Sequence, residues 1–167
     1  GGQQFVRGMV TCHHQQEGGG GNLIAAGGSD GLVGLVSLSG KKSVGVLRHS
    51  EDSSVEAVRW SPEGVNGGAS LATAGVDGSV KVWEGASLRA TLGHPGGVTC
   101  VRWTGSADRS LVTGCSDGGV RVWDTRLVDG ALLRLCRGHT DMVLCLEVGG
   151  GAIYSGGDDH RINVWKL

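Results

Sequence analysis

Residues 74–83 read AGVDGSVKVW, a glycine-rich turn that leads into alternating β-branched residues and ends at a tryptophan. Three related stretches follow the same plan, namely GGSDGLVGLV at 27–36, GCSDGGVRVW at 114–123 and GGDDHRINVW at 156–165. Their turn aspartates are Asp30, Asp77, Asp117 and Asp159, which are 47, 40 and 42 residues apart. A repeat of this length, built around β-branched runs, predicts a series of similar β-sheet units.

Outside these turns the chain also reads as short strands. Glycine accounts for 33 of the 167 residues and proline for only 2, which suits many tight turns between strands. We therefore predict an all-β chain with four antiparallel units near 8–48, 54–92, 97–136 and 142–167. In the second unit, for example, strands are expected at 55–60, 69–74, 79–84 and 88–92. The last unit ends after its third strand, so it should lack an outer strand and expose an unpaired edge.

Four residue types recur at fixed positions in the last three units. The sets are His49, Thr73, Asp77 and Trp83; His94, Thr113, Asp117 and Trp123; and His139, Ser155, Asp159 and Trp165. A buried aspartate needs hydrogen-bond donors, which a histidine and a hydroxyl can supply, and a buried indole N–H needs an acceptor. The first unit has Ala26 and Val36 at two of these positions and no aligned histidine, so we expect it to be the least stable.

This pattern resembles the WD40 family of β-propellers, in which His, Ser/Thr, Asp and Trp form a hydrogen-bonded structural tetrad. The resemblance implies a four-stranded blade for each unit and a platform that holds other molecules. It also implies that the chain is part of a larger propeller, in which the missing outer strand comes from the opposite terminus of a longer chain.

The sequence offers no convincing catalytic, cofactor or metal site. A Ser-His-Asp triad would need a nucleophile elbow or a comparable setting, whereas these residues recur three times with threonine replacing serine in two copies. The adjacent His13 and His14 point to opposite faces of a strand and cannot easily share a metal ion, and His160 is expected in a loop. We therefore predict a protein that is not an enzyme and has no cofactor.

Composition also limits the partners and the compartment. The net charge of −1 gives no general attraction to nucleic acid or to an anionic membrane, and no apolar run is long enough to span a bilayer. The five cysteines are an odd number without a Cys-x-x-Cys pair, which favours reduced, buried thiols and a cytoplasmic or nuclear location.

In WD40 propellers, partners bind at the top face, where the residue before the turn aspartate and two residues at the start of the first strand point outward. Carried onto this chain, the resemblance gives a top-face set with one acidic member in each of two units. The set is Glu56, Val76, Thr99, Ser116, Met142, Leu144 and Asp158. Ser54 and Gly97 belong to the same positions, and the first unit would add Met9, Thr11 and Ser29. With Glu51, Asp52 and Asp141 nearby and no lysine or arginine in the set, the face should favour a basic peptide.

One stretch carries a narrower resemblance. Residues 27–62 contain Asp-turn, Leu-Val-Ser, Gly-Lys and Val-Gly-Val-Leu-Arg in an order similar to that of angio-associated migratory cell protein. That subfamily includes a fungal chaperone dedicated to one large-subunit ribosomal protein. The resemblance implies an escort that holds a basic ribosomal-protein segment on its top face until the protein joins the maturing large subunit. The alternative is a scaffold or substrate-recruiting subunit of a ubiquitin-ligase, signalling or trafficking complex.

Overall fold

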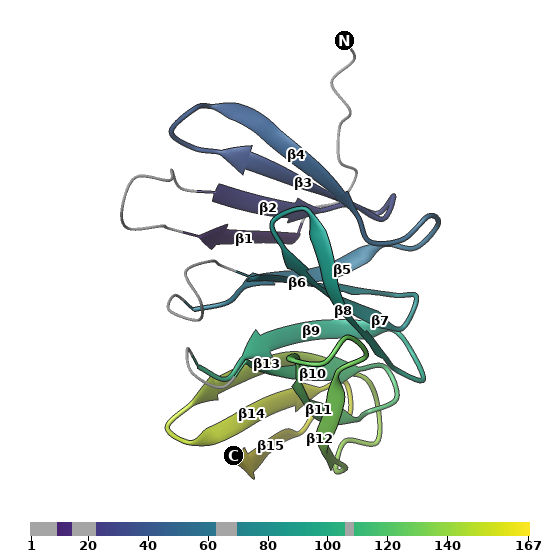
Figure 1. Cartoon of the computed structure of the whole chain (residues 1–167). Coiled ribbons are helices and arrows are strands. Elements are labelled where there is room, and N and C mark those ends of the chain that lie inside the picture. The colour runs from purple at the N-terminus through teal and green to yellow at the C-terminus, as the bar shows by residue number, and fades with distance from the viewer. Residues whose placement is uncertain (1–9, 15–22, 63–69, 106–108) are drawn as a thin grey trace.

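The computed structural model describes residues 10–14, 23–62, 70–105 and 109–167. These residues form separate β-sheets stacked one after another, with the N-terminal sheet at one end of the stack and the C-terminal sheet at the other (Figure 1). The described residues contain no helix, and accordingly none that could cross a membrane. The predicted all-β class is therefore confirmed.

Two four-stranded antiparallel sheets make up the first half of the stack, and each follows chain order from its first to its fourth strand. Sheet A contains β1 (Val10–His14), β2 (Leu23–Gly27), β3 (Leu32–Ser37) and β4 (Lys42–Arg48). Sheet B contains β5 (Val55–Trp60), β6 (Ser70–Gly75), β7 (Ser79–Glu84) and β8 (Ser87–Gly93). The four strands predicted for the second unit therefore all occur, with ends that differ by at most one residue.

The second half repeats this arrangement, except that the last sheet is narrower. Sheet C contains β9 (Val98–Trp103), β10 (Ser110–Cys115), β11 (Val120–Asp124) and β12 (Ala131–Cys136). Sheet D contains β13 (Val143–Gly149), β14 (Ala152–Gly157) and β15 (Ile162–Lys166). Among the described residues no fourth strand pairs with β15, so β15 is an edge strand as predicted.

The repeated turn after each second strand explains its glycine. Gly31, Gly78 and Gly118 have φ angles of 74°, 77° and 76°. A Cβ atom on Gly31 would lie 2.2 Å from the carbonyl oxygen of Ser50, and one on Gly118 would lie 2.7 Å from that of His139. Left-handed backbone together with a backbone atom at contact distance leaves room for glycine alone. His160 occupies the equivalent position of sheet D, with a φ of 60°.

The apolar core lies between the sheets rather than within any one of them. Each internal junction has its own cluster of buried side chains, to which both neighbouring sheets contribute. The cluster between sheets A and B includes Val33, Val55, Val58, Leu71 and Trp83. The cluster between sheets B and C includes Val80, Val82, Val101, Leu111 and Trp123. The cluster between sheets C and D includes Val112, Val122, Val143, Leu146 and Ile153. Because hydrophobic burial dominates folding, these junctions hold the stack together.

Candidate partner-binding face and the tetrads that support it

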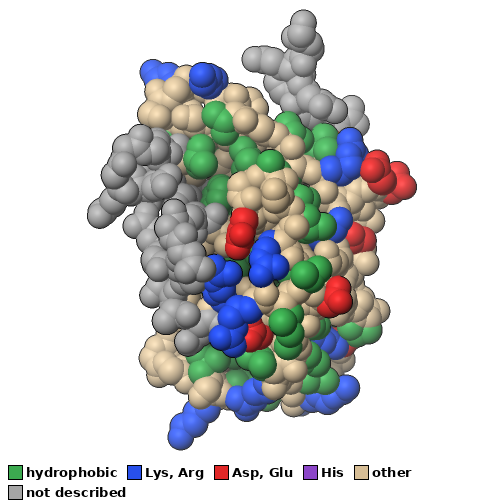
Figure 2. All heavy atoms as spheres, in the orientation of Figure 1, with side chains coloured by type: hydrophobic (Ala, Val, Ile, Leu, Met, Phe, Trp, Pro, Cys, Tyr) green, Lys and Arg blue, Asp and Glu red, His purple; other side chains and the backbone are tan. Residues whose placement is uncertain are grey.

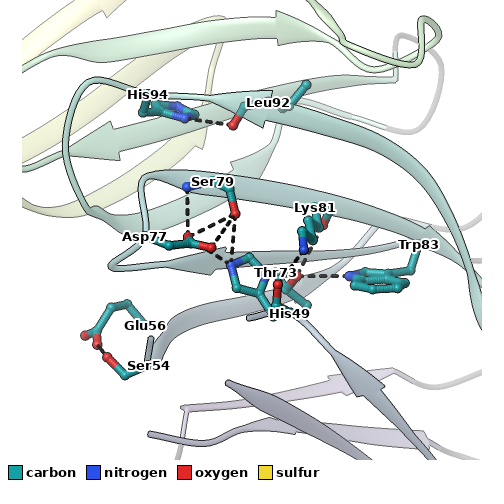
Figure 3. A network of polar contacts seen from close by, with 10 residues as sticks. All are labelled: His49, Ser54, Glu56, Thr73, Asp77, Ser79, Lys81, Trp83, Leu92 and His94. Atoms are coloured by element: carbon teal, nitrogen blue, oxygen red, sulfur yellow. Dashed lines mark hydrogen bonds and ion pairs between the residues drawn. The ribbon is translucent and has the colours of Figure 1, made fainter. Parts of the chain in front are cut away.

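The tetrad of sheet B forms a continuous chain of hydrogen bonds (Figure 3). The indole N–H of Trp83 donates to Thr73 Oγ1 at 2.9 Å, and Thr73 Oγ1 lies 2.8 Å from His49 Nδ1. His49 Nε2 lies 3.3 Å from Asp77 Oδ1, whose carboxylate also accepts hydrogen bonds from the backbone N–H and the hydroxyl of Ser79. Burial opposes ionisation of Asp77, but these donors outweigh it and hold its pKa below the usual value.

The tetrad of sheet D has the order of a hydrolase triad but a buried hydroxyl. His139 Nδ1 lies 2.9 Å from Asp159 Oδ1, and His139 Nε2 lies 2.8 Å from Ser155 Oγ. Ser155 is 1% exposed, and its oxygen also accepts the indole N–H of Trp165 at 3.0 Å. A nucleophile must reach its substrate, and this hydroxyl cannot. The geometry supports a structural role for the set.

Sheet C departs from the predicted tetrad. His94 Nδ1 lies 3.1 Å from the carbonyl oxygen of Leu92, so this nitrogen carries the proton, and Nε2 accepts from the hydroxyl of Thr113 at 2.8 Å. Thr113 in turn accepts the indole N–H of Trp123 at 3.0 Å. Asp117 pairs instead with Arg121, whose Nη1 and Nη2 lie 3.0 and 2.5 Å from its two carboxylate oxygens. The arginine satisfies the aspartate, and the histidine finds a backbone acceptor.

Two of the tetrad histidines also join neighbouring sheets. The backbone N–H of His49 donates to the oxygen of Gly31 in the turn of sheet A, and that of His94 donates to the oxygen of Gly78 in sheet B. Their side chains contact Thr73 of sheet B and Thr113 of sheet C, respectively. Each of these histidines therefore fixes one sheet relative to the next.

Burial of these histidines predicts sensitivity to mild acid. Burial lowers the pKa of His94 to about 4 and also lowers that of His49. An unfolded histidine binds a proton near pH 6.5, so folding is penalised as the pH falls from that value towards the folded pKa. For His94 alone we expect the free energy of unfolding to fall by about 2 kcal/mol between pH 7 and pH 5. Urea denaturation at the two pH values measures this loss.

Two variants assign this loss to the buried ring. In His94→Gln the difference in stability between pH 7 and pH 5 should shrink by about 2 kcal/mol. His160→Asn removes an exposed histidine at a backbone conformation that asparagine tolerates, so its pH dependence should match that of the wild type. An equal pH dependence in His94→Gln and wild type would contradict the assignment.

The same backbone contact recurs at one edge of sheets B, C and D. The turn after each second strand donates a hydrogen bond to the link that enters the sheet. Val76 N–H donates to Ser54 O at 3.1 Å, Ser116 N–H to Gly97 O at 2.8 Å and Asp158 N–H to Met142 O at 2.8 Å. These contacts hold turn and link side by side, and they place the predicted top-face residues at one edge of the stack.

A pocket of about 250 Å³ opens at this edge, where sheets B, C and D meet. Its lining contains five of the seven predicted top-face residues together with two others. The lining residues are Glu56, Val76, Gly97, Val98, Thr99, Ser116 and Met142. Most of this wall is apolar or small, and Glu56 is its one ionisable side chain.

Polar groups fix the rim and the wall of this pocket. The Ser54 hydroxyl donates to Glu56 Oε1 at 2.5 Å, and the Thr99 hydroxyl donates to the backbone oxygen of Gly114 at 3.1 Å. Thr99 also contacts the backbone oxygen of Val143, which connects sheet C to sheet D. The carboxylate of Glu56 is exposed and so remains available to a partner.

The remaining predicted top-face residues lie outside this pocket. Leu144 and Asp158 are exposed on sheet D and its turn, and Asp158 reaches the pocket only through its bond to Met142. Ser29 is exposed in the turn of sheet A. Met9 and the side chain of Thr11 fall outside the described residues. Val98, which forms part of the lining, was not predicted because its alternation marks it as a core residue, and it is indeed fully buried.

Comparisons with known proteins agree with this architecture. The family described as "WD domain, G-beta repeat" matches residues 41–84, 86–124 and 130–166. An uncharacterized WD repeat-containing protein of Schizosaccharomyces pombe is 31% identical over 143 residues, which cover 83% of this chain and 34% of that protein. A "Ribosome biogenesis protein WDR12 homolog" of Culex quinquefasciatus is 31% identical over 58% of this chain and 24% of its own length. The chain thus spans about a third or less of these curated relatives.

Solved structures show the same fold. The computationally designed protein Ika4 matches 99% of this chain and 99% of its own chain, with a TM-score of 0.75 and 22% identity. The computationally designed Ika8 matches 90% of this chain but only 44% of its own, with a TM-score of 0.73 and 24% identity. The repeated sheets, the tetrads and the family match over most of the sequence lead to one assignment: the chain belongs to the WD40 repeat family.

Proposed function

We propose that this chain is a non-enzymatic protein-binding platform whose top-face pocket receives a side chain of its partner. The observation that carries the proposal is that Glu56, Val76, Thr99, Ser116 and Met142, from three sheets, line one open pocket. At about 250 Å³ the pocket lies below the usual range for small-molecule and cofactor sites. A side chain presented by a peptide suits this size better.

The charges around the pocket favour a basic partner. Glu56, Asp158 and the nearby Glu51, Asp52 and Asp141 are exposed. An apolar wall beside a carboxylate fits a lysine or arginine, because the aliphatic stem can be buried while the charged head meets the carboxylate. On the face shown in Figure 2, by contrast, basic and acidic side chains lie close together, as Arg89 and Arg109 do with Glu84. Such mixed charge suits a protein partner better than a nucleic acid.

The narrower proposal is an escort for a basic ribosomal protein during large-subunit assembly. It is supported by the acidic top face, by the resemblance of residues 27–62 to the angio-associated migratory cell protein subfamily, and by similarity to a relative whose name records a role in ribosome biogenesis. The escort would shield the basic segment of a newly made protein until the ribosome provides its binding site.

Charge reversal at the pocket provides the test. Glu56→Lys combined with Asp158→Lys should abolish binding of the basic client, because it replaces attraction by repulsion on an exposed surface. The melting temperature should stay unchanged, since both side chains are exposed. Client binding is measured by affinity capture from lysate at moderate salt with mass spectrometry, followed by calorimetry with a peptide of the captured protein.

Asp129→Lys is the matched control for each single reversal, because Asp129 is exposed in the link between β11 and β12 and changes the net charge equally. It should bind like wild type. Capture of one free ribosomal protein, lost on reversal at Glu56, would support the escort. Capture of a ligase or signalling complex with the same dependence would retain the platform and reject the escort, and unchanged affinity after reversal would reject the pocket itself.

A further inference from the structure

Every internal junction of the stack joins the same two kinds of surface. We call the surface that a sheet turns towards the preceding sheet its front face, and the opposite surface its rear face. In sheet B the front face carries Leu71 and Trp83, which pack against sheet A. The rear face carries Val80 and Val82, which pack against sheet C. The junctions of sheets A with B, B with C and C with D all pair a rear face with the next front face.

The rear face of sheet D has no partner among the described residues, and it is apolar. Counted from the turn aspartate, Tyr154, Ile162 and Val164 occupy the positions that Val112, Val120 and Val122 occupy in sheet C. The sheet C residues are 0%, 0% and 6% exposed, whereas those of sheet D are 43%, 79% and 61% exposed. Sheet D therefore displays side chains of the kind that a junction buries.

The front face of sheet A is open in the same way. Ile24 and Val36 occupy the positions of Leu71 and Trp83, and both are at least partly exposed. Ala26 and Gly34 stand where sheet B has Thr73 and Lys81, so the polar groups of the tetrad are replaced by small ones. This surface can accept an apolar neighbour without leaving a buried polar group unpaired.

From these two faces we infer that a second copy of this chain binds head to tail, the rear face of sheet D in each copy packing on the front face of sheet A in the other. The chain itself carries both halves of the junction, and it forms that junction three times internally. Its two open faces lie at opposite ends of the stack (Figure 1). A head-to-tail contact gives a closed ring when the rotation closes and a filament when it does not.

The size of the ring follows from the comparison with designed proteins. The four-sheet stack matches 90% of this chain but only 44% of Ika8, so the same fold occurs as less than half of a longer folded chain. Two copies of the stack provide the missing portion. Closure also brings a neighbour to the free edge of β15, where sheet D has three strands and the other sheets have four. An exposed apolar edge strand is otherwise prone to aggregate.

Sedimentation of the 167-residue chain tests this inference. The wild type should sediment at twice the 17.1 kDa of one chain. Val164→Lys on the rear face and Val36→Lys on the front face should each sediment as one chain, because each ring junction needs both faces. Leu133→Lys is the matched control, since Leu133 is exposed on the outer strand of sheet C, away from both end faces, and should stay a dimer.

Thermal melting gives a second readout that does not depend on any variant folding. Dissociation coupled to unfolding should make the melting temperature of the wild type rise with protein concentration. A single-chain mass with a concentration-independent melting temperature would overturn the inference and leave both faces for further blades of a longer chain. Masses that grow beyond two copies would overturn ring closure, and a Val36→Lys dimer would show that rear faces pair with each other.

Discussion

Asp117→Ala should lower the free energy of unfolding by about 3–5 kcal/mol, because it leaves a buried guanidinium without its counter-ion. The side chain of Arg121 is 8% exposed, and both carboxylate oxygens of Asp117 contact it. Hydrogen bonds from Arg121 hold the pKa of Asp117 well below its usual range, so the aspartate is ionised at neutral pH. Urea denaturation of the variant at pH 7 measures the loss.

A second substitution separates the ion pair from other roles of Asp117. Arg121→Leu in the Asp117→Ala background removes the orphaned charge and should recover much of the stability. Asp77→Ala in sheet B is the matched control. The equivalent Lys81 donates to the backbone oxygen of His49 instead, so its charge keeps a partner and the loss should be smaller. Equal losses for Asp77→Ala and Asp117→Ala would refute a special role for the arginine pair.

Leu111→Ala should cost about 2–5 kcal/mol, the range for deleting a fully buried leucine side chain. Leu111 is 0% exposed and lies in the cluster between sheets B and C with Val101 and Trp123. Because the junctions contain the core, a cavity there loosens one sheet from the next. Chemical denaturation gives the change in stability. Leu133→Ala, at an exposed leucine of the neighbouring strand β12, should change stability by less than about 0.5 kcal/mol, and a similar loss in both variants would place the core elsewhere.

The alternating pattern of the sequence predicts the strands well because each strand has one face against a neighbouring sheet. Strand β5 occurs at Val55–Trp60 and β9 at Val98–Trp103, as the alternation of buried residues indicates. The strand ends differ by a residue or so elsewhere, as at β8, because backbone pairing continues into the turn after the apolar pattern has ended.

The tetrads could be predicted only in part. In sheets B and D the histidine, hydroxyl, aspartate and tryptophan are connected, whereas in sheet C Arg121 takes the aspartate. Arg121 follows the aspartate by four positions, where sheets B and D have Lys81 and Asn163. All three side chains are polar and fit the alternation, so the sequence pattern does not distinguish them. Which of them reaches the carboxylate depends on side-chain length and on the fork of the guanidinium.

The candidate pocket was predicted better in its centre than at its border. Glu56, Val76, Thr99, Ser116 and Met142 converge because sheets B, C and D follow one another closely. Leu144 and Asp158 occupy equivalent positions of the last sheet, but the next sheet that would complete a pocket around them is absent from the described residues. Repeat equivalence predicts where a residue sits on its own sheet, and the neighbouring sheet decides what it lines.

The histidines that join neighbouring sheets have a mechanical consequence. Tension applied between the two ends of the chain would pass from sheet to sheet through the β4–β5 and β8–β9 links, which are also where His49 and His94 fasten one sheet to the next. Each histidine shortens the length of link that can extend before a junction is loaded. The stack would therefore resist stretching as a row of fastened plates, with its compliance confined to the strands at its two ends.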